Sequence, residues 1–401
     1  HLYNPRTRRG ILSKRGDAKF KQSIADTLDA SNQFFGFLGT SLLAERSVVR
    51  LRGPGSAEAL LNEPLTALER SISKIADALE DGRERDEALE QRARIRAIRA
   101  GVDGWLNLSD AGHVYWGEKG GRKQTIVTLR SAPIDVAPEL ERCLFGSGVS
   151  VICTSATLAL GGEMGRFAAT IGALTARMDV AESPFDFERN MRVYMAADIP
   201  PPSAGDSRSA IDAMSDYIEY CTTRVKGGSL VLFTSYRDMQ AAAAIVGPLL
   251  ASKGRPFMMQ GGDISRTELA QRMRDLGNAV LFGTDSFWTG VDVPGNALSQ
   301  VMIVRLPFSP PTHPVAEAKA ELIKDRGGDP FNELTLPEAL IKFRQGVGRL
   351  IRTKSDKGLI TILDSRILGK SYGRMFVAGL PQREFTRLTK ENRDEQFRPF
   401  T

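Results

Sequence analysis

The sequence predicts an α/β protein in which a parallel sheet is wrapped by helices and joined to a separate all-α helical hairpin. Between residues 229 and 363, short apolar strands alternate with helical segments, which is typical of a parallel sheet with helical crossovers. Between residues 65 and 105, apolar residues recur every three or four positions, the period of packed helices. The 401 residues suffice for two or three domains, and a net charge of +6 allows a nucleic-acid partner without requiring one.

The amino-terminal part of the chain is predicted to be helical from residue 20 to residue 105. Two seams with heptad-like spacing lie on either side of the polar stretch 81–85, so we expect two antiparallel helices joined by a tight turn. Residues 1–22 are rich in Arg and Lys and are either a solvated tail or a phosphate-contacting segment. The seams consist of Leu65, Leu68, Ile72, Ile75 and Leu79, and of Ile95, Ile98, Val102 and Trp105.

From residue 113 onward the pattern changes to that of strands and alternating helices. In parallel sheets, functional residues lie mostly on the loops at the carboxyl ends of strands. The segments that follow these strands are therefore the candidates for catalysis and binding. Stretch 119–122 is predicted as a hairpin turn, 198–207 as a loop and 150–154 as a buried strand. Further strands are predicted at 113–118, 124–130, 229–233, 256–259, 279–282, 300–305 and 359–363, and helices at 237–250, 265–276 and 337–351.

Cysteine usage and hydropathy narrow the class of protein. Cys143, Cys153 and Cys221 are far apart and show no metal or disulfide spacing, so we expect buried thiols in a reducing, cytoplasmic setting. No apolar run reaches the roughly 18 residues of a membrane span, and no signal peptide is visible, so no membrane partner is expected. The chain starts with His1 rather than Met, which suggests a piece of a longer protein.

The octet 345–352, Gln-Gly-Val-Gly-Arg-Leu-Ile-Arg, carries the strongest candidate side chains. In a continuous helix, Gln345, Arg349 and Arg352 lie on one face, and the two guanidinium groups are about 4.5 Å apart along the axis. A glycine in a helix interior costs about 1 kcal/mol relative to alanine, so Gly346 and Gly348 suggest close packing against the backbone. The alternative is a surface helix with two solvated arginines.

Three other segments follow predicted strands and complete the candidate set. The first contains Ser155, Ala156 and Thr157, and the second contains Tyr236 and Arg237. The third, residues 283–295, contains Ser286, Phe287, Trp288, Gly290 and Asp292.

In this order, the segments resemble the later motifs of superfamily 2 helicases, in particular of the DinG/XPD-type DNA helicases. Residues 155–157 resemble the third motif, 230–236 the fourth, 282–295 the fifth and 345–352 the sixth; 132–138, 183–189 and 327–331 are also similar. The resemblance covers roughly residues 110–380 and implies a RecA-like motor domain. It implies an arch-like helical domain at 1–110, the end of a first motor domain at 111–180 and a second motor domain at 181–401.

Two features of the family are missing from this chain. It has no Gly-x-x-x-x-Gly-Lys-Ser/Thr phosphate loop and no Asp-Glu-Ala-His box, which hold the phosphates and Mg²⁺ in such motors. In the family both lie upstream of the arch, so the resemblance implies a carboxyl-terminal portion that is inactive without an amino-terminal motor half. ATP and Mg²⁺ would be held mainly by that half. Iron–sulfur ligands, where the family has them, also lie upstream, so the presence of a cluster stays open.

The resemblance also implies a role for each candidate residue. Arg349 and Arg352 are expected to be arginine fingers, with Gln345 near the γ-phosphate or the attacking water. Core packing remains the alternative for Phe287 and Trp288, a capped helix start for Tyr236 and Arg237, and helix capping for Thr157. Thr289 stands where relatives often have Glu. The remaining roles are nucleotide contact for Gly290, Asp292 and Gly348, coupling for Ser155, Ala156 and Thr157, and DNA contact for Tyr236, Arg237, Ser286, Phe287 and Trp288.

The function implied by the resemblance is an ATP-dependent DNA helicase, with 5′-to-3′ polarity, that acts on single-stranded or forked DNA in repair or replication. We expect a monomer. One alternative is a catalytically incomplete module that binds single-stranded DNA or a protein partner. Another is a degenerate scaffold, which the intact Gln345, Arg349 and Arg352 argue against.

Overall fold

The computed structural model describes residues 10, 16–121, 125–201, 207–262, 264–289, 293–310 and 312–400. The chain divides into two compact units: unit 1 comprises His1–Val136 and Pro310–Arg326, and unit 2 comprises Ala137–Ser309 and Gly327–Thr401. These boundaries differ from those expected at residues 110 and 180, because the strands after residue 113 pack with the helices of unit 1. The division by motor role therefore remains a prediction.

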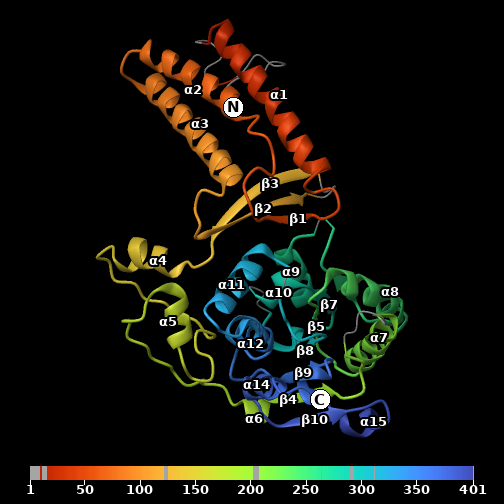
Figure 1. Cartoon of the computed structure of the whole chain (residues 1–401). Coiled ribbons are helices and arrows are strands. Elements are labelled where there is room, and N and C mark those ends of the chain that lie inside the picture. Colours follow the sequence, from red (N-terminus) through yellow and green to blue (C-terminus); the bar gives the residue numbers. More distant parts are fainter. Residues whose placement is uncertain are drawn as a thin grey trace. The chain divides into compact units, whose positions relative to one another are not determined.

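Unit 1 combines helices with an antiparallel sheet of strand order β1–β2–β3 (Figure 1). Strands β2 and β3 confirm the two strands predicted after residue 113, whereas β1 corrects the helical prediction for residues 20–105. Residues 48–51 form a strand because β2 offers them a partner, a tertiary effect that local periodicity does not reveal. The described elements of unit 1 are α1 (Ala18–Thr40), β1 (Val48–Leu51), α2 (Asn62–Asp77), α3 (Arg83–Asn107), β2 (His113–Gly120), β3 (Ile126–Pro133) and α11 (Pro314–Asp325).

The predicted helical hairpin is confirmed as α2 and α3, which are joined by residues 78–82. Glu69 of α2 pairs with Arg96 and Arg99 of α3, at 3.0 and 3.2 Å. Trp105 is buried as expected, whereas Ile98 is 52% exposed and does not belong to the second seam. The seam at the start of α3 instead uses Ala88, which is fully buried.

Helix α11 packs against the antiparallel sheet through both apolar and charged contacts. Ala318 belongs to the same buried cluster as Val114 and Trp116 of β2. Arg50 of β1 pairs with Glu321 of α11 at 2.8 Å, and hydrogen bonding from Arg50 lowers the pKa of that carboxyl. A segment distant in sequence thus completes unit 1.

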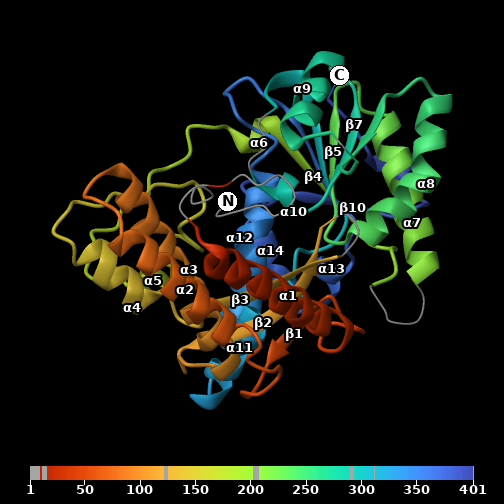
Figure 2. The same ribbon diagram turned by 90° about the horizontal axis from the view of Figure 1, so that it is seen from above.

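Unit 2 is built on a seven-stranded sheet in which every neighbouring pair is parallel (Figures 1 and 2). The five strands predicted between residues 229 and 363 are confirmed as β5 to β9, and β4 and β10 were missed. Short apolar runs carry too little periodicity to be assigned on their own. In spatial order the strands are β10 (Phe385–Leu388), β4 (Met191–Ala196), β9 (Gly358–Ile362), β8 (Gln300–Ile303), β5 (Ser229–Leu232), β7 (Val280–Gly283) and β6 (Phe257–Met259).

Helices cover both faces of this sheet, and alternate strand residues supply the two cores. Leu230 and Leu232 face one core, whereas Val231 and Phe233 face the other. The second core is closed by α7 (Ser207–Thr223) and α8 (Tyr236–Ser252), which lie side by side in Figure 2. The first is closed by α9 (Arg266–Leu276), α10 (Asp285–Trp288), α12 (Leu336–Val347), α13 (Arg366–Gly369) and α14 (Gly373–Ala378).

Short helical turns complete the described part of unit 2. They are α4 (Ala137–Leu140), η1 (Glu141–Phe145), α5 (Gly165–Ile171), α6 (Phe187–Asn190), η2 (Gly295–Ala297), η3 (Phe331–Thr335) and α15 (Arg393–Gln396).

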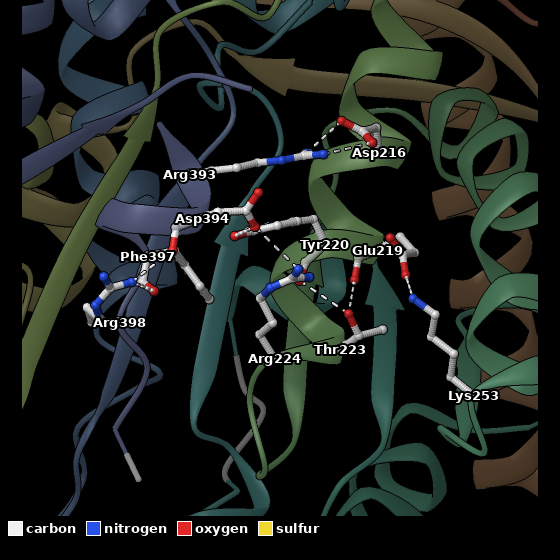
Figure 3. Close-up of polar contacts among 10 residues, drawn as sticks. All are labelled: Asp216, Glu219, Tyr220, Thr223, Arg224, Lys253, Arg393, Asp394, Phe397 and Arg398. Atoms are coloured by element: carbon white, nitrogen blue, oxygen red, sulfur yellow. Dashed lines mark hydrogen bonds and ion pairs between the residues drawn. The ribbon is translucent and has the colours of Figure 1, made fainter. Parts of the chain in front are cut away.

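A network of charged and aromatic side chains fastens α15 to α7 (Figure 3). Arg393 donates to both carboxylate oxygens of Asp216, at 2.7 and 3.3 Å, and the Tyr220 hydroxyl donates to Asp394 at 2.8 Å. The guanidinium groups of Arg224 and Arg393 lie over the Tyr220 ring, 3.6 and 4.1 Å from its centroid. Burial, together with the bond to Asp394, raises the pKa of Tyr220 to about 12.

The prediction of a strand at 150–154 is wrong. These residues pair with no described strand, and Ile152 is 88% exposed. A central parallel strand needs neighbours on both sides to satisfy its backbone groups, and none is present here. The thiols of Cys143 and Cys153 are exposed, although they were expected to be buried. Cys221 is buried as expected, and burial raises the pKa of its thiol.

Candidate active site

The octet 345–352 is not one helix, which corrects the expected alignment of its side chains. Helix α12 ends at Val347, and the Gly348 amide closes the last turn on the Arg344 carbonyl at 2.9 Å. Leu350 and Ile351 are buried directly after it. Because these two apolar residues enter the core, the chain leaves the helical path. Gln345 therefore lies in the last turn of α12, whereas the two arginines lie on the loop that follows.

Gly346 lies where another element packs close to the helix backbone, as expected for a glycine in a helix interior. A Cβ atom at this position would lie 2.8 Å from the Trp288 ring and 3.1 Å from Leu232. Gly348 differs, since it is exposed and caps the helix end. The expectation of close packing by another element therefore holds for Gly346 alone.

The rings of Phe287 and Trp288 are fully buried, which corrects their expected DNA contact. Both are 0% exposed, and the Trp288 indole donates to the Phe233 carbonyl at 2.9 Å. Lys342 of α12 lies over the Trp288 ring at 5.6 Å and forms an ion pair with Asp285. Burial of large aromatic rings in the core is energetically favourable. Because both rings are enclosed, neither presents a face on which a base can stack.

Direct hydrogen bonds bring three candidate segments together. The Gln345 carboxamide donates to the Thr157 hydroxyl at 3.4 Å, and Arg344 donates to the Ala159 carbonyl. The Arg349 guanidinium donates through Nε to the Trp288 carbonyl at 3.1 Å. The end of α12 thus contacts the 155–159 turn, and the loop after α12 contacts the 285–288 helix.

The segment 155–157 forms a hydroxyl-stabilised turn rather than a helix cap. The Thr157 amide donates to the Ser155 Oγ at 3.3 Å, and the two hydroxyl oxygens are 3.3 Å apart. Ser155 and Ala156 are exposed, whereas Thr157 is half-buried against Gln345. Thr157 therefore bonds both the Gln345 side chain and the exposed Ser155.

The loops after β5 and β6 meet at the carboxyl edge of the parallel sheet. Ser235 caps α8 by accepting from the Asp238 amide at 3.3 Å, and this leaves Tyr236 44% exposed with Arg237 exposed beside it. A Cβ at Gly261 would lie 2.3 Å from the Tyr236 hydroxyl. A glycine with a φ of +137° therefore allows the tyrosine to approach the next loop.

The loops after β6 and β7 are joined by polar side chains. The Gln260 carboxamide oxygen accepts from both the amide and the hydroxyl of Thr284, at 2.7 and 3.0 Å. Ser286 is half-buried, and its carbonyl accepts from Arg266 at 3.0 Å. These bonds tie Thr284 to the loop after β6 and the start of α10 to Arg266 of α9.

The backbone at Arg352 is held by a nearly buried carboxylate. Asp356 Oδ2 accepts from the Arg352 and Thr353 amides, at 2.8 Å each, and Oδ1 accepts from the Thr353 hydroxyl at 2.7 Å. Asp356 is 8% exposed. Burial alone would raise its pKa, but these bonds and one from the Gly295 backbone outweigh burial and lower it.

Comparison with known proteins identifies the family. Residues 218–383 match the helicase C-terminal domain. The ATP-dependent DNA helicase YoaA of Escherichia coli is 35% identical over 296 residues, which are 74% of this chain and 44% of that protein. The 3'-5' exonuclease DinG of Bacillus subtilis is 35% identical over 266 residues, 66% of this chain and 29% of that protein. This chain belongs to the DinG/XPD-type superfamily 2 helicases. It spans less than half the length of these curated relatives.

The fold agrees with this DinG/XPD-type assignment. A solved structure titled XPD_Helicase superposes with a TM-score of 0.60 at 18% identity, covering 93% of this chain and 64% of that one. A second, titled XPD_APO, also gives 0.60, at 16% identity, covering 93% and 72%. At this identity the likeness establishes the fold, and it confirms the RecA-like α/β class.

Several expectations for the DinG/XPD-type motifs lie beyond the described part of the chain. Gly290 and Asp292, the expected nucleotide contacts of the fifth motif, fall outside it, as does most of the basic segment 1–22. Among the described residues, no group of three or more His, Cys, Asp and Glu side chains could hold a metal ion. No described helix is long and apolar enough to cross a membrane.

Sequence reasoning missed the residues that position the motif loops. Asp356 had a visible signal, because Thr353-x-x-Asp356 is the spacing of a capping box. Gln260 and Arg266 had none, since their partners in the 284–289 loop are distant in sequence.

Proposed function

We propose that this chain is the carboxyl-terminal part of an ATP-dependent DNA helicase. The observation that carries the proposal is that α12 and the loop after it contact two other motifs: Gln345 contacts Thr157, and Arg349 contacts the Trp288 carbonyl. In phosphoryl transfer, catalysis rests on positioning and on cations opposite the developing charge. A carboxamide in the last turn of α12 and two arginines on the loop that follows match that need.

In this mechanism each motif residue has a distinct part. Arg349 and Arg352 stabilise the charge that develops on the transferred phosphoryl group, and Gln345 orients the γ-phosphate or the attacking water. Gly348, Gly290 and Asp292 contact the nucleotide. Ser155, Ala156 and Thr157 couple the nucleotide and DNA sites, since Thr157 bonds Gln345 and the exposed Ser155 shares its turn.

The rest of the nucleotide site is proposed to come from an amino-terminal motor half, which supplies the phosphate loop. The described residues of this chain do not fit a Mg²⁺ site, so no step here is routed through the ion. Exposed apolar side chains before β4, including Ile152 at 88%, Leu174 at 71% and Val149 at 62%, support an extensive partner surface. We expect no DNA-stimulated ATP hydrolysis from this chain alone.

The DNA side of the site is proposed to lie at the carboxyl edge of the parallel sheet. Tyr236 and Arg237 combine an exposed aromatic ring with a cation, which is the chemistry of single-strand tracking. Ser286 lies in the short helix α10 after β7, and Gln260 ties Thr284, just before that helix, to the loop after β6. Further parts of the proposal are action on forked DNA, 5′-to-3′ polarity, a role in repair or replication, a monomeric state and a cytoplasmic setting.

Fluorescence anisotropy with labelled oligonucleotides tests the DNA proposal on this chain directly. We expect salt-sensitive binding that favours single-stranded over duplex DNA. Tyr236→Ala should weaken single-strand binding by about 5- to 150-fold, the equivalent of about 1–3 kcal/mol per stacked base. Leu249→Ala, on the same helix and 45% exposed, is the matched control and should bind normally. Equal affinity for both forms of DNA, or an unchanged Tyr236 variant, would count against the site.

A second candidate function is a nucleotide-free module that binds single-stranded DNA without turnover. The lack of a phosphate loop in the sequence favours it. An ATP hydrolysis assay on the full-length protein distinguishes the two functions. A motor hydrolyses ATP when DNA is added, whereas a binding module binds DNA and hydrolyses no ATP.

A further inference from the structure

We propose that Asp356 is a positioning residue for the arginine finger at 352. The inference rests on the proposed function. The carboxylate binds two successive amides of the finger loop, those of Arg352 and Thr353, at 2.8 Å each.

The bonds of Asp356 fix the path of the chain on one side of Arg352, and burial fixes it on the other. Leu350 and Ile351 are 2% and 4% exposed, so the residues before the finger are anchored in the core. The Thr353 hydroxyl adds a third bond, to the opposite oxygen of the carboxylate, at 2.7 Å. The backbone from which the guanidinium extends is therefore held from both directions.

Removing the carboxylate leaves the finger present but loosely placed, and a misplacement of about 1 Å can cost about 100-fold in rate.

The test compares four variants of the full-length protein in ATP hydrolysis at saturating single-stranded DNA: Asp356→Ala, Arg352→Lys, the double variant, and Glu391→Ala. Glu391 is an exposed carboxylate of unit 2 and serves as the control. We expect Asp356→Ala to lower kcat by about 10- to 100-fold, with the KM for ATP and the DNA affinity within about twofold. In the Arg352→Lys background, which keeps the charge but loses the guanidinium fork, the same change should cost only about twofold if the two residues act as a unit.

Amide hydrogen exchange on this chain gives a readout that does not depend on turnover. Asp356→Ala should speed exchange at Arg352 and Thr353, and Glu391→Ala should not. Unchanged exchange overturns the inference. A loss of kcat that is equally large in the Arg352→Lys background also overturns it, because Asp356 then acts on the fold rather than through the finger. If the unsubstituted full-length protein shows no DNA-stimulated hydrolysis, the proposed function itself fails, and the inference with it.

Discussion

Two stretches of unit 2 differ in what covers their apolar side chains. Between residues 191 and 388 the seven strands bury theirs under helices on both faces. Between residues 144 and 180, Val149, Ile152 and Leu174 are 62%, 88% and 71% exposed. The apolar run of the second stretch is as suitable for a strand as those of the first, but no described strand pairs with it. Sequence alone supplies the apolar residues, and pairing partners decide whether they form a sheet.

The same contrast separates the motifs of the proposed site. The arginine-bearing loop after α12 is anchored in the complete sheet by Leu350 and Ile351. The turn that carries Ser155 and Thr157 receives hydrogen bonds from Gln345 and Arg344. The arginine-bearing loop is thus fixed by burial in the core, whereas this turn is held by polar contacts and leaves Ser155 exposed.

The largest expected effect comes from the same substitution made in both stretches. Ile362→Ala removes a fully buried side chain of β9 and should lower the free energy of unfolding by about 2–5 kcal/mol, through lost burial and the cavity left behind. Ile152→Ala should change it by less than about 0.5 kcal/mol, because the side chain is already in water. Urea denaturation of this chain measures both. Similar losses at the two sites would show that residues 144–180 are packed, and would contradict the difference between the two stretches.

A smaller effect is expected where α12 meets the sheet. Gly346→Ala places a methyl group 2.8 Å from the Trp288 ring and should destabilise unit 2 by about 1–3 kcal/mol through overpacking. Gly101→Ala is the matched control: it lies within α3 with no atom close to the added carbon. That change should stabilise unit 1 by up to about 1 kcal/mol, as helix propensity predicts. If both alanines stabilise, α12 and Trp288 do not pack as described.

The smallest effect concerns the α15–α7 network at high pH. The raised pKa of Tyr220 means that folding favours its neutral phenol. Its stabilisation is therefore complete below the unfolded-state pKa of about 10 and is lost as the pH rises toward about 12. Tyr220→Phe should cost about 1 kcal/mol at neutral pH and should reduce the alkaline loss of stability. Denaturation at several pH values measures this, with the exposed Tyr236→Phe as control; an unchanged alkaline profile in Tyr220→Phe would contradict the role of this phenol.

Much of the fold followed from the sequence because its strands and helices have clear periods. The five strands from residue 229 to residue 363 and the hairpin of α2 and α3 were predicted within a few residues. The prediction that residues 345–352 form one helix was wrong because Leu350 and Ile351 are buried in the core after the helix ends. A rule based on local residue spacing does not take such burial into account. β1 was missed for a similar reason, since its pairing with β2 is a tertiary contact.

Among the candidate site residues, polar and charged side chains do contact other candidate segments in the structure, while their roles stay predictions. Gln345 and Thr157 meet, and Arg349 reaches the fifth motif. Aromatic residues were less reliable: Phe287 and Trp288 belong to the core, because a ring suited to stacking on a base is equally suited to packing. The positioning contacts of Asp356 and Gln260 depend on backbone amides whose location only the fold defines.

The central claim is that the loop after α12 supplies a catalytic arginine to ATP. The most direct test is DNA-stimulated ATP hydrolysis by the full-length protein, with and without Arg352→Ala. We predict a loss of about 10³-fold or more in turnover, the scale of an arginine finger, while single-stranded DNA is bound with nearly unchanged affinity. Turnover by the Arg352→Ala protein at the rate of the unsubstituted protein would contradict the claim.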